Sequence, residues 1–322
     1  MKVLHIGSYW MGENDIVQRM AAVLSEMVPT VCIDTLLYQN GWHRWVEREG
    51  EVYWLREDAL LPVVEQERPD VIVCNAGGHG IRPETRARLG KAVLVGIALS
   101  DPDVFDYQTR YIAPHFDLFY TNCPDRIGDY ASIGVEARLL PFAVDPAYYR
   151  PLGLERDLDV VLVGHARPDR KVFVAPLQRH FRVGLFGRGW GGGCGEATGR
   201  EHVRAINRGK LYLSLTRTLA QFHNTKGGVF EASACRTPVV TEHLAQTARY
   251  FEFGREIIGF DGADDLPQVI AAYLNDGSRR EAVAEAAYRR VLREHTWQKR
   301  WEQVLDDVRS QSRLGPAVAG RV

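Results

Sequence analysis

Residues 223–243 read HNTKGGVFEASACRTPVVTEH and carry the clearest structural signal in the chain. The residues up to Gly228 predict a loop, and the apolar and small residues from Val229 to Cys235 predict a closely packed helix. Thr237-Pro238 breaks that helix, and the β-branched residues that follow predict a buried strand. The stretch is therefore expected to join a loop, a helix start and a strand.

The helix start in this stretch has the chemistry of an anion site. Backbone N–H groups at a helix N-terminus attract anions, and glycines let a phosphate come close. Lys226 adds a positive charge, and Glu231 can accept hydrogen bonds from a ribose diol. The alternative is a surface lysine and an acid that merely favours the helix dipole. We predict a nucleotide-diphosphate site formed by Asn224, Thr225, Lys226, Gly227, Gly228 and Glu231.

The segment FEASACRTPVVTE, residues 230–242, resembles the FEA-x-ACG-x-P motif of nucleotide-sugar-dependent glycosyltransferases with the GT-B fold. The similarity is strongest to the group-1 branch that includes spore-maturation-type glycosyltransferases. It extends over residues 159–301, whereas in the first half only the strand and loop pattern agrees. In this family the acid that matches Glu231 holds the ribose of the nucleotide.

Three positions depart from the family pattern. Arg236 replaces the glycine of the ACG motif, and Gly228 replaces an arginine that is often found there. His223 stands where enzymes with a paired-acid motif carry a second acid. The resemblance implies that Lys226 or Arg170 replaces the phosphate contact that Gly228 lacks.

The alternation of strands and helices predicts an α/β protein with parallel sheets. With the resemblance, this implies a GT-B fold: two Rossmann-like, doubly wound parallel-sheet domains facing a central cleft. We expect an acceptor domain over residues 1–150 and a nucleotide-sugar donor domain over residues 151–295. Residues 296–322 would form a C-terminal helix, which can cross back onto the first domain, and a tail. Within the first domain, residues 42–64 are expected to be mostly helical.

Three residues of the first domain lie beyond predicted strands, where open parallel sheets bind ligands. Asp15 could act as a base toward an acceptor hydroxyl or could cap the next helix. His79 lies among glycines and could contact a sugar, or be incidental. Asp101 would face the transferred sugar or simply form a turn. Asp101 and Asp103 form a D-x-D sequence, but Pro102 between them argues against a metal site, and we predict none.

Three further residues of the second domain are candidates for donor binding. Gly164 ends a predicted strand and permits close approach of a ligand, and Arg170 could hold a diphosphate. Trp190, in the glycine-rich stretch 187–195, could stack on the base. The alternatives are a solvated run of charges at residues 167–171 and a flexible connection at 187–195.

Composition and net charge exclude some classes of function. The chain has 322 residues and a net charge of −1, so no broad attraction to nucleic acid is expected. The five cysteines are scattered and show no zinc spacing, which favours a reduced cytoplasmic protein. We predict no signal peptide and no membrane span. The preference for arginine over lysine favours a bacterial source.

The sequence therefore predicts a metal-independent glycosyltransferase that needs no cofactor beyond its nucleotide-diphosphate sugar. The acceptor hydroxyl or amine would belong to a soluble small molecule or a glycan. Two alternatives remain open: a nucleotide-sugar epimerase on the same fold, and a binding protein that keeps the fold without turnover.

Overall fold

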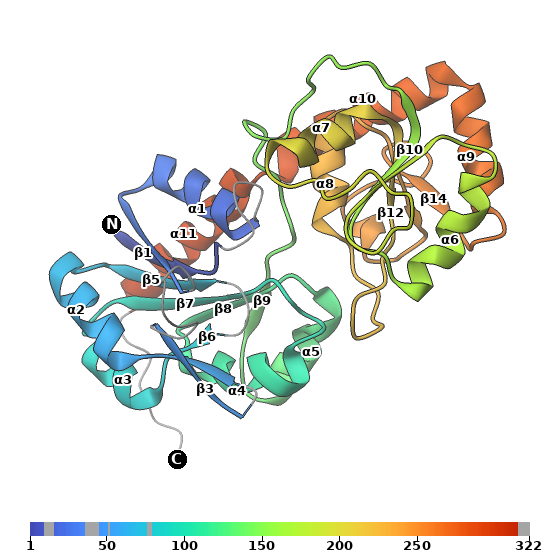
Figure 1. Cartoon of the computed structure of the whole chain (residues 1–322). Coiled ribbons are helices and arrows are strands. Elements are labelled where there is room, and N and C mark those ends of the chain that lie inside the picture. Colours follow the sequence, from blue (N-terminus) through green and yellow to red (C-terminus); the bar gives the residue numbers. More distant parts are fainter. Residues whose placement is uncertain (10–15, 36–44, 51, 76–78, 315–322) are drawn as a thin grey trace. The chain divides into compact units, whose positions relative to one another are not determined.

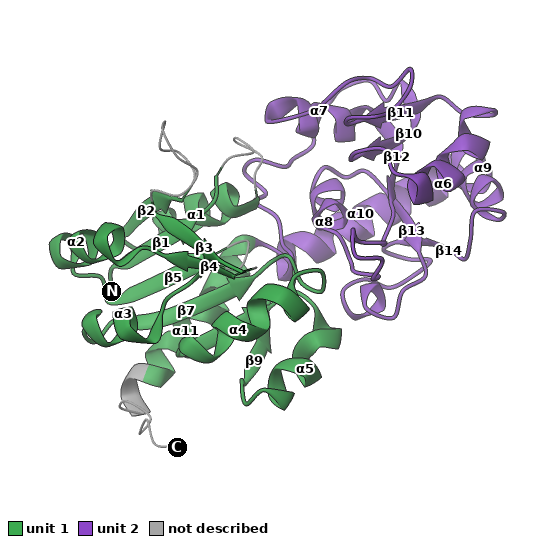
Figure 2. Ribbon diagram, turned by 60° about the horizontal axis from the view of Figure 1, so that its bottom comes forward, with its two compact units in different colours: residues 1–11, 15–141, 297–322 green, residues 12–14, 142–296 purple. Residues whose placement is uncertain are grey.

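A computed structural model describes residues 1–9, 16–35, 45–50, 52–75 and 79–314 (Figure 1). The chain divides into two compact units (Figure 2). The first comprises residues 1–11, 15–141 and 297–322, and the second comprises residues 12–14 and 142–296.

The first unit is built on a six-stranded parallel sheet in the order β2-β1-β5-β7-β8-β9. These strands are β1 (Val3–Gly7), β2 (Thr30–Asp34), β5 (Val71–Asn75), β7 (Val93–Ala98), β8 (Leu118–Thr121) and β9 (Ala137–Leu139). The chain enters at β1, adds β2 on one side and the other four strands on the other side, as in a doubly wound sheet. Strands β1, β5 and β8 are buried along their whole length, which explains their continuous apolar sequences.

Helices accompany this sheet, and a smaller sheet adjoins it. The helices are α1 (Ile16–Met27), α2 (Glu57–Glu67), α3 (Pro83–Arg88), η1 (Phe105–Thr109), α4 (Arg110–Ile112), η2 (Ala113–His115), η3 (Pro124–Arg126), α5 (Ile127–Ser132) and α11 (Trp297–Leu314). The smaller sheet has the order β3-β4-β6, with β3 (Val46–Glu49) antiparallel to β4 (Val52–Leu55) and β6 (His79–Gly80) parallel to β4. For the described residues 45–50 and 52–56 the mostly helical prediction for residues 42–64 is thus wrong, because valine and aromatic residues there pair as strands. Residues 42–44 lie outside the described part of the chain.

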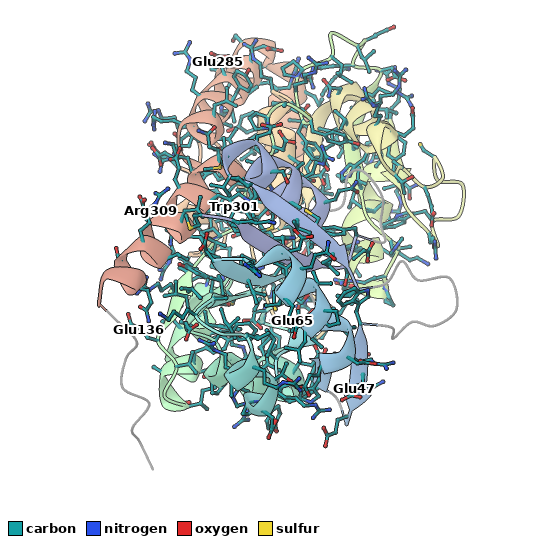
Figure 3. The ribbon with its side chains drawn as sticks, turned by 90° about the vertical axis from the view of Figure 1, so that its left-hand side faces the viewer. Glu47, Glu65, Glu136, Glu285, Trp301 and Arg309 are labelled. Atoms are coloured by element: carbon teal, nitrogen blue, oxygen red, sulfur yellow. The ribbon has the colours of Figure 1, made fainter. Side chains whose placement is uncertain are left out.

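The last helix belongs to the first unit. Trp301 is only 1% exposed, and its indole N–H donates to the backbone carbonyl of Met20 in α1 at 2.8 Å (Figure 3). The hydroxyl of Tyr120 in β8 donates to the Asp307 carboxylate at 2.6 Å. Helix α11 therefore packs against α1 and β8 and forms part of the first unit.

The second unit has a five-stranded parallel sheet in the order β11-β10-β12-β13-β14. Its strands are β10 (Leu158–Val163), β11 (Val183–Phe186), β12 (Gly209–Ser214), β13 (Val239–Glu242) and β14 (Ile258–Phe260). Its helices are α6 (Pro168–Gln178), α7 (Arg200–Arg208), α8 (Gly227–Ala234), η4 (Thr247–Arg249), α9 (Leu266–Asn275) and α10 (Gly277–Glu294).

Side chains alternate between the two faces of this sheet, as strand geometry requires. On one face, Val161 of β10 and Tyr212 of β12 join a core with α7, α8 and α10. On the other face, Val160 and Leu211 from the same strands join a core with α6 and α9. The predicted α/β architecture with two doubly wound parallel sheets is confirmed. Among the described residues, no helix is both long and apolar enough to cross a membrane.

Candidate functional site

The loop before α8 is anchored at its backbone. Asn224 and Thr225 are each 3% exposed. The Asn224 N–H donates to the carbonyl of Thr216, which follows β12, at 3.0 Å. The Thr225 N–H donates to the Gln246 side-chain carbonyl at 3.0 Å, and the Thr225 and Thr247 hydroxyls lie 2.9 Å apart. These contacts tie the loop to segments that follow β12 and β13, so it has a defined position at the carboxyl edge of the sheet.

The start of α8 presents backbone donors. Lys226 occupies the N-cap position with extended backbone angles, φ −88° and ψ 153°, and its side chain does not cap the helix. Gly227 and Gly228 form the first two helical positions, where N–H groups have no partner within the helix. Because both residues lack side chains, an anion can reach these N–H groups closely.

Glu231 lies one turn further along α8 and is nearly withdrawn from water. Its side chain is 12% exposed, and it is hydrogen-bonded to the Tyr149 hydroxyl. His202 of α7 places Nε2 at 3.7 Å from a carboxylate oxygen. Burial raises the pKa of Glu231 to about 7, although the Tyr149 hydrogen bond acts in the opposite direction. Burial also lowers the pKa of His202 to about 4, so this imidazole is neutral at pH 7 and does not offset the carboxylate charge.

Arg170, on the first turn of α6, is held beside the end of β10. Its guanidinium donates to the carbonyl of His165 at 2.8 Å. Gly164 has φ +149°, and a Cβ at that position would come within 2.5 Å of the Arg170 Nη1 atom. The Arg170 Nε atom is buried and makes no hydrogen bond. Gly164 thus acts through its lack of a side chain, which makes room for the arginine.

Trp190 has a structural contact of its own. Its indole N–H donates to the Gly164 carbonyl at 2.8 Å, and its ring packs against the core shared with α6 and α9. The indole therefore anchors the glycine-rich stretch to the end of β10. The predicted stacking on a base stays a prediction.

The three catalytic candidates of the first unit have different settings. Asp15 lies outside the described residues. His79, in β6, is 9% exposed, and its ring lies edge-on to Tyr53 at a centroid distance of 6.0 Å. Its predicted contact with a sugar stays a prediction. Asp103 follows Asp101 in a turn closed by an N–H bond to the Ser100 carbonyl at 3.0 Å.

Asp101 has the setting of a structural carboxylate. It is 2% exposed and accepts hydrogen bonds from Thr109 at 3.1 Å, Thr121 at 2.7 Å and Tyr130 at 2.6 Å. Burial raises its pKa, and these three hydroxyl donors work against that rise. These three donors hold the carboxylate in place, and its predicted role beside the transferred sugar stays a prediction.

Sequence reasoning missed the residues that surround Glu231. Tyr149 lies in the proline-rich stretch 141–151, and His202 lies on a helix with no motif. Both converge on Glu231 only through the fold, and no periodicity or spacing marks them. In the described part of the chain, no group of three or more His, Cys, Asp or Glu side chains is arranged to hold a metal ion.

Comparison with known proteins supports this description. Residues 167–306 match the family model described as glycosyl transferase-like. The fold is similar to that of sucrose-phosphate synthase from Thermosynechococcus elongatus, with a TM-score of 0.66 and 12% identity over 98% of this chain and 100% of that one. It is also similar to Anabaena HepE in complex with UDP and glucose, with a TM-score of 0.66 and 13% identity over 96% and 100% of the two chains.

A third similar structure is AviGT4, a glycosyltransferase involved in avilamycin A biosynthesis, with a TM-score of 0.65 and 17% identity over 97% and 98% of the two chains. No curated protein matches the sequence. The chain thus has the GT-B fold of nucleotide-sugar-dependent glycosyltransferases. Residues 167–306 are similar to the glycosyl transferase-like family, and together with the GT-B fold this bears out the predicted resemblance to group-1 GT-B glycosyltransferases.

We expect Glu231→Gln to stabilise the protein at alkaline pH. The unfolded carboxyl ionises near 4.5 and the folded one near 7, so the native state loses stability as pH rises through this interval. At pH 8 the loss is about 3 kcal/mol, and the amide removes it. Urea denaturation at pH 5 and pH 8 would measure this. The exposed Glu281→Gln on α10 is the control, and an equal effect of Glu231→Gln at both pH values would contradict the assignment.

Asp101→Ala should destabilise the first unit, because three buried hydroxyl groups lose their acceptor. The expected loss in free energy of unfolding is about 3 kcal/mol or more. Asp103→Ala, in the same turn, should cost less than about 1 kcal/mol. Chemical denaturation of the two variants compares them. A fully stable Asp101→Ala protein that has lost activity would instead support the predicted role of Asp101 beside the transferred sugar.

Proposed function

We propose that the protein transfers a sugar from a uridine-diphosphate sugar to an acceptor hydroxyl. The observation that carries the proposal is the buried carboxyl of Glu231 one turn beyond two glycines and Lys226 at the start of α8. A ribose diol can donate to the Glu231 carboxylate while the diphosphate meets the N–H groups of Gly227 and Gly228. The HepE structures in complex with UDP and with UDP-glucose support uridine as the nucleoside.

The reaction would proceed by stabilisation of the leaving group. The bond between the anomeric carbon and the diphosphate oxygen breaks, the acceptor oxygen bonds to that carbon, and the acceptor proton leaves. Lys226, Arg170 and the two glycine N–H groups would offset the charge that develops on the diphosphate. We propose that these groups replace a metal ion, so that transfer continues in EDTA. The first unit would bind the acceptor.

Incubation with UDP-glucose and other UDP-sugars tests the activity, with UDP release and products analysed in the presence and absence of sugar and polyol acceptors. Transfer predicts a glycosylated acceptor together with UDP. An altered sugar nucleotide without any acceptor would show an epimerase, and binding without turnover across the panel would show a binding protein. Absence of binding to any uridine nucleotide would overturn the proposal.

Arg170→Ala should weaken UDP-glucose binding about tenfold, because a charge-assisted hydrogen bond to phosphate is lost. Lys171→Ala, at the next residue of the same helix, is the matched control, because its side chain is exposed and should leave affinity unchanged. Calorimetric titration of both variants measures the difference. Equal dissociation constants for the two variants would remove Arg170 from the site.

Affinity for UDP-glucose should fall as pH drops below about 7. Only the ionised form of Glu231 can accept both ribose hydroxyls, and its pKa near 7 means that acidification protonates it. The affinity should decrease up to tenfold for each pH unit below that value. UDP-glucose is the probe, since it lacks the terminal phosphate that titrates near 6 in UDP. Glu231→Gln should bind weakly at every pH, and a wild-type affinity that is constant from pH 5 to 8 would refute the mechanism.

A further inference from the structure

The Tyr212 side chain lies beneath the first turn of α8. It belongs to β12, is 4% exposed, and packs in the core that β12 shares with α7, α8 and α10. Its hydroxyl lies where a side chain at position 228 would begin: a Cβ on Gly228 would overlap the Tyr212 oxygen and come within 3.1 Å of Cζ. Position 228 is therefore bare, and the phenol takes up the space that a larger residue would need.

The hydroxyl of this side chain lies within electrostatic range of both charged groups of the proposed donor site. Glu231 raises the pKa of Tyr212 and Arg170 lowers it, in addition to a larger increase from burial. The net effect is upward, so the phenol keeps its proton and can donate a hydrogen bond. No hydrogen bond from a described residue contributes to this shift in the pKa of Tyr212.

A phenylalanine would fill the same apolar space without the oxygen. The oxygen lies beside Gly228 and within electrostatic range of Arg170 and Glu231, which indicates a ligand that accepts a hydrogen bond from it. The diphosphate of the donor is the acceptor-rich part of such a ligand, and it would meet the adjacent N–H of Gly228.

We propose that Tyr212 is a donor-binding residue whose hydroxyl donates to a diphosphate oxygen beside Gly228 and Arg170. This inference rests on the proposed function and adds to it a contact that comes from within the sheet. It also gives Gly228 a specific part: its missing side chain lets the phenol reach the first turn of α8.

Tyr212→Phe tests the proposal, because it removes one oxygen and keeps the packing. We expect the dissociation constant for UDP-glucose to rise about tenfold while the melting temperature of the ligand-free protein stays the same or rises. Tyr273→Phe on α9, a buried tyrosine on the opposite face of the sheet, is the control and should keep wild-type affinity. Unchanged affinity in Tyr212→Phe would overturn the inference.

A second variant tests the part played by Gly228. Gly228→Ala should displace the phenol and weaken binding in the wild-type background, and it should weaken binding less in Tyr212→Phe, where the oxygen that it would overlap is gone. Strictly additive effects would contradict the shared site. If the wild-type protein binds neither UDP nor UDP-glucose, the proposed function itself fails; if it binds and Tyr212→Phe binds equally well, only this inference fails.

Discussion

The second unit keeps one carboxyl group, that of Glu231, out of water near the start of α8. An ionised carboxyl group is unfavourable there, and the neutral imidazole of His202 does not stabilise its charge. Tyr149 supplies one hydrogen bond, which lessens but does not cancel the effect of burial. The ligand-free protein is therefore less stable at high pH than it would be with an amide at this position. A ligand that donates two hydroxyls to the carboxylate would recover that energy, which makes the destabilisation a sign of function.

The rest of the site is arranged by parallel strands that end at one edge. Strands β10 and β12 are hydrogen-bonded neighbours, and so are β12 and β13. The loop that begins α8 can therefore be tied to segments after β12 and β13, while Arg170 is placed by the segment after β10. Two glycines permit this arrangement because they have no side chain: Gly164 makes room for Arg170, and Gly228 makes room for Tyr212. Backbone geometry positions these groups before any ligand binds.

The sequence predicted what depends on local pattern. Buried strands such as Val71–Asn75 have continuous apolar runs, and residues 223–243 identify the loop, the helix and the acid without help from the fold. Patterns fail where partners come from distant segments, as when Tyr149 and His202 converge on Glu231. They also gave no sign of the hydroxyls, up to 29 residues away in the chain, that donate to the Asp101 carboxylate. In the β3–β4 hairpin, strand pairing overrode the expectation of a helix.

Two of the three departures from the family pattern, at Arg236 and Gly228, have separate structural explanations. Arg236 has φ +52°, the left-handed conformation that a glycine would adopt at the end of α8. Its guanidinium pairs with Glu285 of α10 at 2.5 Å and lies 5.6 Å from the ring centre of Tyr288, so contacts with α10 offset the backbone strain. At Gly228 the Tyr212 hydroxyl occupies the space in which a side chain would begin. Because each departure has a compensating contact within the same unit, neither one by itself favours a protein that binds nucleotide sugars without turnover.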